Sequence, residues 1–315
     1  MALSYTTGRN LAGTWTKNTA SAHLTYIDSV ANADYKLLCA LRDWPFLERN
    51  RTISTTASTQ FTTLPYDCDL VREISVIPTG STTRYTPREV TSRADWDRLN
   101  LSTFDSDIPE YWFVLNGQVG LWPRPASTGN TIYVQQKTRA VDLNAADYTT
   151  GTISTTVTTA GVTTVTGAST VWSTSMIGRY IRITATDAAA TLVGDGVWYE
   201  IAGVASTTSM TLVRAYGGTA IAAATAAYTL SQMPLLPEAF HDLPWLASAG
   251  DYWSKEGDKR AKYYIDTHGH PAMGNLPATG KVKELIAAYS SASTSMVIDE
   301  GMEREIINPN LTIRL

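Results

Sequence analysis

The chain has 315 residues and a mass of 34.3 kDa, which is enough for two domains or for one body that carries an insertion. Only 17% of the residues are charged, and the net charge of -4 excludes a protein that coats nucleic acid by neutralising phosphates. The two cysteines, Cys39 and Cys68, are too few for a disulfide framework or a four-cysteine zinc site. Residues 1–10 do not read as a signal peptide, and no apolar run approaches roughly 18 residues, so we expect a non-secreted, non-membrane chain.

A helix is predicted over residues 18–42. Its apolar residues fall at spacings of one helical face: Leu24, Ile27, Ala31, Leu38 and Leu41. Pro45 cannot continue this helix, so the chain turns there. We interpret Trp44-Pro-Phe-Leu47 as an apolar plug in the core.

Short alternating runs broken by Pro and Gly predict strands between residues 51 and 137. The expected strands are 51–55, 70–78, 111–115, 118–123 and 131–137. The dipeptide Asn116-Gly117 tolerates positive φ at both positions, which predicts a hairpin with a type I′ turn. Residues 93–100 predict a short helix with Trp96 and Leu99 on one face.

Residues 149–231 differ in composition and are predicted to form a separate module. Threonine supplies eleven of the 22 residues from 149 to 170, lysine is absent, and the charges cancel. Alternation recurs in six segments, at 152–157, 162–165, 179–184, 197–204, 209–213 and 226–230, and favours a small barrel or sandwich. A disordered linker is the alternative, but large apolar residues such as Trp172 and Trp198 argue against it.

Helices return after Pro234, over residues 238–267 and 281–289. Pro244 is expected in a first turn or at a kink, and the charged run 255–260 lies on a solvated face or at a break near Gly257.

The last residues, 296–315, are predicted to form an arm that docks on a partner, because an apolar end without its own domain needs one. The residues that we expect to dock are Ile307, Asn308, Leu311, Ile313 and Leu315.

Catalytic signatures such as a phosphate-binding Gly-rich loop, a nucleophile elbow or His-Glu-x-x-His are missing from the sequence. His268 and His270, with His241 upstream, form the one tempting cluster, but at a helix end we expect His268 and His270 to face water. We therefore predict no catalytic, cofactor-binding or metal-binding residues and no cofactor, and hence a protein that is not an enzyme.

Other reactive groups receive structural interpretations. The pairs Asp95 with Asp97 and Asp105 with Asp107 lack the spacing of a calcium loop and are read as caps and loop charges. Cys68 has no histidine nearby in the sequence and is a weak nucleophile candidate. The 9 Trp and 16 Tyr favour packing between subunits over nucleic-acid binding, because no basic stripe accompanies the rings.

The order of several short motifs resembles that of tailed-bacteriophage head-to-tail connector proteins of the adaptor type. The motifs are Arg42-Asp-Trp-Pro-Phe-Leu-Glu48, Phe61-Thr-Thr-Leu-Pro65, Tyr85-Thr-Pro-Arg-Glu-Val90 with Trp96, Ile108-Pro-Glu-Tyr111, Gly120-Leu-Trp-Pro-Arg-Pro125 and Leu236-Pro-Glu-Ala-Phe-His241. The segment around Trp172 and Met176-Ile-Gly-Arg-Tyr-Ile-Arg-Ile183 looks like a small β-module of phage structural proteins.

This resemblance implies an α+β fold, with residues 1–148 and 232–315 as the connector body and residues 149–231 as an inserted all-β domain. It implies a homo-oligomeric ring of twelve copies in the virion, made in the host cytoplasm. The ring lies beneath the portal protein and above a downstream stopper or tail protein, and DNA passes through it without sequence-specific binding or contact with a membrane.

Two other readings stay open at this point. A tail or baseplate component has the same structural character. A carbohydrate-binding module would use Trp172, Trp198 and Tyr199 as exposed stacking platforms.

Overall fold

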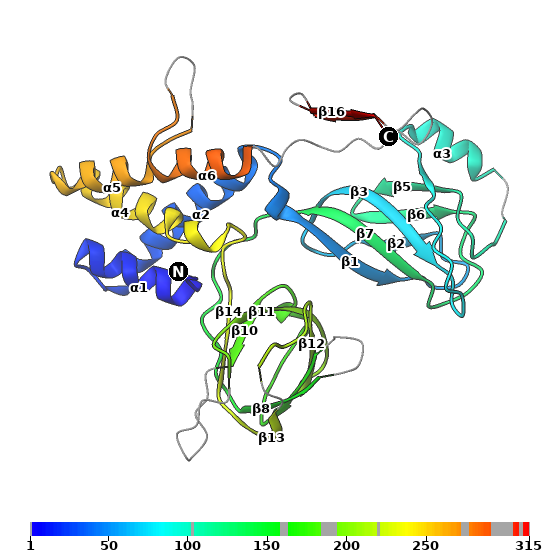
Figure 1. The fold of residues 1–315 in the computed structure, drawn as a ribbon, viewed down its shortest axis with the longest axis horizontal. Coiled ribbons are helices and arrows are strands. Elements are labelled where there is room, and N and C mark those ends of the chain that lie inside the picture. Colours follow the sequence, from blue (N-terminus) through cyan, green and yellow to red (C-terminus); the bar gives the residue numbers. More distant parts are fainter. Residues whose placement is uncertain are drawn as a thin grey trace. The chain divides into compact units, whose positions relative to one another are not determined.

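The computed structural model describes residues 2–101, 104–157, 163–183, 194–218, 221–271, 277–290, 305–308 and 311–314. It confirms the predicted α+β class, with helices and β-sheets in one chain (Figure 1). The chain divides into two compact units. The first contains Met1–Leu37 and Asp142–Ala288, and the second contains Leu38–Val141 and Tyr289–Leu315.

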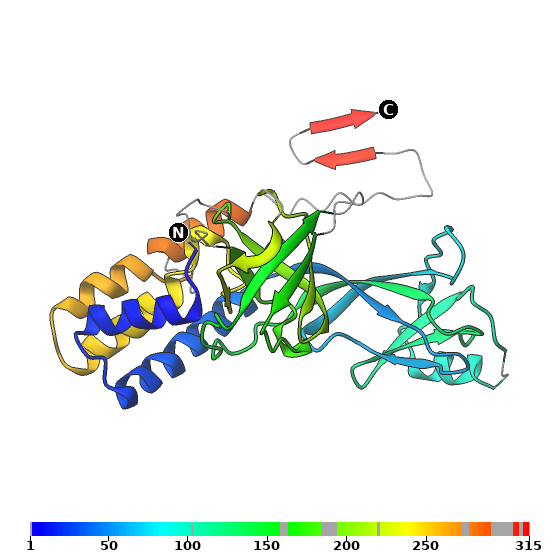
Figure 2. The same ribbon diagram turned by 90° about the horizontal axis from the view of Figure 1, so that it is seen from below.

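Helices from both ends of the sequence gather in the first unit (Figure 2). They are α1 (Tyr5–Thr16), α2 (Ser21–Ala40), α4 (Leu243–Lys255), α5 (Arg260–His268) and α6 (Gly280–Ser290). The predictions for α2 and α6 are confirmed. Helix α1 was not predicted, because Gly8 and Gly13 interrupt its apolar pattern, although Ser4 caps it by accepting a hydrogen bond from the Thr7 amide at 3.2 Å.

Helix α1 is stabilised by close contact with α4. Gly8 lies directly against the indole of Trp245, which is fully buried, and a methyl group at position 8 would overlap that ring. The start of α1 is also bonded to the segment before α4, because the Tyr5 amide donates to the Gln232 carbonyl at 2.8 Å. A glycine that weakens α1 as an isolated helix is therefore the residue that lets it pack.

The predicted helix over residues 238–267 is divided into three elements. A 3-10 turn, η3 (Glu238–Phe240), precedes α4, and Gly257 at φ 67° separates α4 from α5. The charged run 255–260 thus lies at a break, and Pro244 lies in the first turn of α4. A positive φ is inexpensive for glycine, which explains why the helix breaks there.

The second unit is built around two antiparallel-rich sheets. One has the order β1-β7-β3, from β1 (Glu48–Ser54), β7 (Thr131–Thr138) and β3 (Cys68–Ile77). The other has the order β2-β6-β5-β4, from β2 (Phe61–Thr63), β6 (Gln118–Trp122), β5 (Tyr111–Leu115) and β4 (Arg88–Glu89). The predicted hairpin is confirmed, since Asn116 and Gly117 have φ of 50° and 72° between β5 and β6.

Apolar side chains from both sheets form one core. Its buried members are Leu64, Ile74, Val76, Trp112, Val119, Leu121, Ile132 and Val134. On the other face of the four-stranded sheet lies the predicted short helix α3 (Arg93–Leu99), whose Trp96 stacks on Phe113 with ring centroids 5.4 Å apart. Gly120 leaves the space that the indole of Trp96 occupies.

The predicted apolar plug is confirmed at the start of this unit. Residues Pro45–Leu47 form a 3-10 turn, η1, with Trp44 and Leu47 each 1% exposed. The Trp44 indole donates to the Leu38 carbonyl at 2.8 Å, so its one polar atom is satisfied. Phe46 stacks on Trp44 and meets Tyr289 edge-on.

Seven strands from residues 152–231 form one curved sheet (Figure 2). In sheet order they are β13 (Ile221–Ala226), β8 (Thr152–Val157), β9 (Thr163–Ala168), β12 (Ser209–Leu212), β11 (Trp198–Ser206), β10 (Tyr180–Ile183) and β14 (Tyr228–Ser231). A 3-10 turn, η2 (Thr174–Met176), precedes β10. The six predicted strands are present, and β13 is an additional one. The core of the seven-stranded sheet includes Trp172, Tyr199, Ile201 and Tyr228. The alternative of a disordered linker is therefore wrong for the described residues of this segment.

The two chain segments that flank this sheet lie close together. The side chain of Gln232 donates to the Asp142 carbonyl at 2.7 Å and accepts from the Asn144 and Ala145 amides at 2.9 Å. Tyr148 exchanges backbone hydrogen bonds with Leu230. These contacts support residues 149–231 as an insertion with adjacent ends, and its independence from the body stays a prediction.

We predict that Gly8→Ala lowers the free energy of unfolding by about 2 kcal/mol, because overpacking a filled core typically costs 1–3 kcal/mol. Gly13→Ala is the matched control on the same helix. A methyl group there would meet the flexible end of Leu24 at 3.1 Å and the Asn18 carbonyl at 3.3 Å, so the substitution should cost much less than Gly8→Ala, whose methyl would overlap an indole. Urea unfolding of both variants measures the difference, and equal losses would contradict the proposed role of Gly8.

Candidate functional site

The C-terminal residues form a hairpin of two short strands. Strand β15 (Glu305–Asn308) pairs with β16 (Leu311–Arg314), so four of the expected docking residues, Ile307, Asn308, Leu311 and Ile313, lie on this hairpin. Leu315 lies outside the described residues. Strand β15 was not predicted, although Asn308-Pro309-Asn310 is a turn sequence.

The pairing places apolar positions together on one face of the hairpin. Ile306 lies opposite Ile313, and Leu311 lies opposite Asn308, and residues directly opposite each other share a face of a sheet. Among the described residues, β15 and β16 pair only with each other. An isolated two-stranded hairpin is marginally stable in water, so this segment requires a further surface.

A second apolar surface follows α3 in the second unit. Leu101, Phe104 and Ile108 are 88%, 57% and 47% exposed. Their backbone is anchored, because the Arg124 amide donates to the Phe104 carbonyl at 3.1 Å and the Arg124 guanidinium pairs with Asp105 at 2.7 Å. Exposed apolar residues beside anchored backbone are typical of contact surfaces, and the sequence does not reveal them because this stretch has no apolar periodicity.

The carboxylate pairs serve local structure, as expected. Asp95 and Asp97 pair with Arg98 and Arg93 along α3. Burial opposes the charge of Asp107, but hydrogen bonds from Asn130 and Ser127 outweigh it and lower the pKa of this carboxyl.

Neither cysteine has the surroundings of a nucleophile. Cys39 is buried, and Cys68 begins strand β3. Burial, together with the neighbouring carboxylates Asp67 and Asp69, raises the pKa of Cys68 to about 11. A thiol with a raised pKa carries little thiolate at neutral pH.

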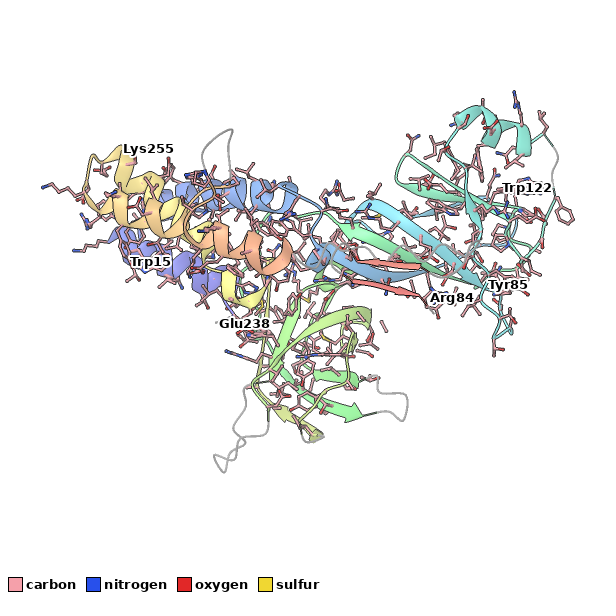
Figure 3. All side chains as sticks on the ribbon, turned by 45° about the horizontal axis from the view of Figure 1, so that its top comes forward. Trp15, Arg84, Tyr85, Trp122, Glu238 and Lys255 are labelled. Atoms are coloured by element: carbon pink, nitrogen blue, oxygen red, sulfur yellow. The ribbon has the colours of Figure 1, made fainter. Side chains whose placement is uncertain are left out.

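His241 is a buried neutral histidine at the start of the α4 region. The Leu3 amide donates to its Nδ1 at 3.2 Å, so Nε2 carries the proton and donates to the Leu236 carbonyl at 2.8 Å. Burial lowers the pKa of His241. Nearby, the side chain of Glu238, which is labelled in Figure 3, accepts a hydrogen bond from the Ala2 amide at 2.8 Å.

The expectation that His268 faces water is wrong. Its Nε2 lies 3.1 Å from a carboxylate oxygen of Asp34 and its Nδ1 lies 2.6 Å from the Gly269 carbonyl. Both partners are acceptors, so this geometry favours the imidazolium, which can donate from both nitrogens. Burial alone would lower the pKa of His268, but Asp34 and the Gly269 carbonyl outweigh it, and the pKa is raised.

Two of the three aromatic residues considered as glycan platforms are buried. Trp172 is 2% exposed and Tyr199 is 4% exposed, and both belong to the core of the seven-stranded sheet. Trp198 is half-buried, and the Arg182 guanidinium lies over its ring at 4.7 Å. Six of the nine tryptophans are buried in cores: Trp44, Trp96, Trp112, Trp172, Trp245 and Trp253.

Within the described ranges, we find no group of three or more His, Cys, Asp or Glu residues arranged to hold a metal ion. Over the same residues, every helix is too short or too polar to span a bilayer.

The two histidines are expected to affect stability with opposite pH dependence. His268 has a raised pKa, so its contribution is present below about pH 6.5 and is lost as the pH rises through its folded pKa. His241 has a lowered pKa, so its contribution is present above about pH 6.5 and is lost as the pH falls. Unfolding midpoints of His268→Gln and His241→Gln measured from pH 5.5 to 8.5 check this. The deficit of His268→Gln should shrink with rising pH and that of His241→Gln should grow, and parallel curves would contradict the assignment.

Comparison with known proteins gives one family. The sequence model of the SU10 adaptor protein family matches residues 6–157, which is just under half of the chain and extends from α1 to β8. A search of curated proteins finds no match. The chain is therefore similar to a phage adaptor family over its first helices, its two-sheet unit and the first strand of the seven-stranded sheet.

Proposed function

We propose that this chain is a structural subunit of a tailed-bacteriophage particle, an adaptor that forms a ring beneath the portal and joins the head to the tail. The match to the SU10 adaptor protein family over residues 6–157 carries the proposal. The fold is consistent with it, because His268 and Asp107, two of the titratable groups considered above, are engaged in hydrogen bonds within the subunit.

The charge of the chain suits a channel for DNA. A ring that conducts DNA should not hold it by strong phosphate pairing, and the net charge is -4. We propose twelve copies per ring, contact with the portal on one side and with a stopper or tail protein on the other, and DNA passage without sequence readout. The subunit would be made in the host cytoplasm and reside in the virion.

The C-terminal hairpin and the loop with Leu101, Phe104 and Ile108 are the surfaces that we assign to assembly. The loop exposes three large apolar side chains, and the two strands of the hairpin pair with no third strand among the described residues. Trp172 and Tyr199, two of the three aromatic residues that glycan binding would use, are buried in a core. No observation favours the glycan-binding alternative.

The direct test is the mass of the full chain in solution, alone and mixed with purified portal rings, by light scattering with negative-stain imaging. We expect free subunits that join the portal as a ring. Two results would contradict the adaptor role: a chain that does not bind the portal, or particles that still join heads to tails without this protein. Either result would favour a place further down the tail.

We predict that deletion of residues 308–315 weakens portal-templated assembly at least tenfold while the melting temperature of the subunit changes by less than about 2 °C. A terminal two-stranded hairpin adds little to the folding of a subunit. Thermal unfolding and the portal assay on the same sample separate the two effects. A large fall in melting temperature would show that the arm belongs to the subunit core.

We also predict that residues 149–231 can be replaced by a short Gly/Ser link while the remaining chain folds, because Gln232 and Asp142 already hold the two ends together. The link should retain Tyr148 and Gln232. Circular dichroism and unfolding of the shortened chain measure this, and an insoluble product would mean that the seven-stranded sheet is integral to the body.

A further inference from the structure

Strand β1 is a regular, open edge of the three-stranded sheet. Its seven residues pair with β7 in unbroken register, from Glu48 opposite Lys137 to Ser54 opposite Thr131. The opposite edge, β3, differs, because its register shifts twice and Tyr85 pairs with Val76 near its end. Arg84, beside Tyr85 in Figure 3, also covers that side by donating to Ser75 at 2.6 Å. Register shifts and covering residues hinder the addition of another strand to β3. The edge of β1 is therefore the better site for strand addition.

The backbone direction identifies the free groups on β1. The Thr55 amide, one residue beyond the strand, donates to the Asn130 carbonyl of the β7 side at 3.0 Å. The backbone N–H and C=O groups of successive residues point to opposite sides of a strand. Those of Arg51 and Ile53 therefore point toward β7, as those of Thr55 do. Those of Asn50, Thr52 and Ser54 point to the outer edge. Within the described ranges β1 is an edge strand that pairs with β7 alone, so these outward groups face no neighbouring strand, and the side chains at 50, 52 and 54 are exposed.

The same chain carries a hairpin that lacks a neighbouring strand. Strands β15 and β16 pair with each other and, in the described part of the chain, with no third strand. Adding such a hairpin to an existing edge satisfies the open backbone groups of both.

We propose that the C-terminal hairpin of a second copy adds to the outer edge of β1, so that each subunit extends the sheet of its neighbour. This rests on the proposed ring. The edge and the hairpin are different parts of one chain, so a contact between them runs head to tail, and such contacts form a ring when the rotation from one subunit to the next closes. Residues 291–304 span at most about 50 Å when extended, about twice the length of a seven-residue strand, so the hairpin can leave its own subunit.

The first test alters the backbone of the edge alone. Thr52→Pro removes one outward N–H and places a ring in the path of an added strand, while pairing with β7 is kept, since proline is tolerated on the open side of an edge strand. We expect at least tenfold weaker ring formation on the portal at an unchanged unfolding midpoint. Thr52→Val keeps the N–H and is the control, and it should assemble like the parent. Equal assembly of all three proteins would overturn the proposal.

A cross-link identifies which copy supplies the hairpin, and it does not depend on how Thr52→Pro folds. In a Cys68→Ser background, Asn50→Cys and Thr312→Cys are combined and treated with a short bismaleimide after assembly on the portal, with each single-cysteine variant as control. We expect a ladder of multimers in a denaturing gel. An internal link within single chains, or rings without any link, would overturn the second-copy contact and leave the adaptor role standing. Failure of the parent chain to join the portal would instead remove the ring, and the inference with it.

Discussion

The close packing of α1 on α4 is the contact on which the chain's organisation depends. Residues more than 200 positions apart meet where Gly8 lies against Trp245, and the Tyr5 amide bonds to the Gln232 carbonyl in the same region. Between these residues the chain first forms the two-sheet unit, which ends at Val141. It then forms the seven-stranded sheet, and the Gln232 side chain after that sheet bonds to the Asp142 carbonyl before it. Loop closure over such distances is entropically expensive, so buried indoles and paired backbone groups must compensate for it.

The distribution of aromatic and charged residues follows from this arrangement. With 17% charged residues, the chain has little charge with which to specify partners, and its largest side chains, such as Trp44, Trp96, Trp172 and Trp245, are used inside. The features that remain available for binding a partner protein are therefore open strand edges and a few exposed apolar side chains. Strand addition gives affinity through the main chain and needs few charges or aromatic side chains.

The histidines illustrate how position decides the state of a group. His241 and His268 both lie near the helical elements of the first unit, yet one accepts an amide hydrogen and is neutral, whereas the other faces two acceptor oxygens, which favour its charged form. Their ring nitrogens are engaged in these hydrogen bonds, so the cluster that attracts attention in the sequence is a pair of structural contacts. Spacing along the chain could not distinguish the two states, because the deciding partners, Leu3 and Asp34, lie far away in sequence.

The sequence by itself determined the class of the fold and most local elements, because these depend on short-range patterns. Apolar spacing predicted α2 and α6, alternation predicted most strands, and Asn116-Gly117 predicted the hairpin from the φ values that those residues tolerate. The order of motifs also indicated a connector, in agreement with the family match over residues 6–157. The tertiary structure alone decided the existence of α1, the burial of Trp172 and Tyr199, and the open edge of β1. Each of these depends on a partner distant in sequence, and a pattern of neighbouring residues carries no information about which distant surfaces meet.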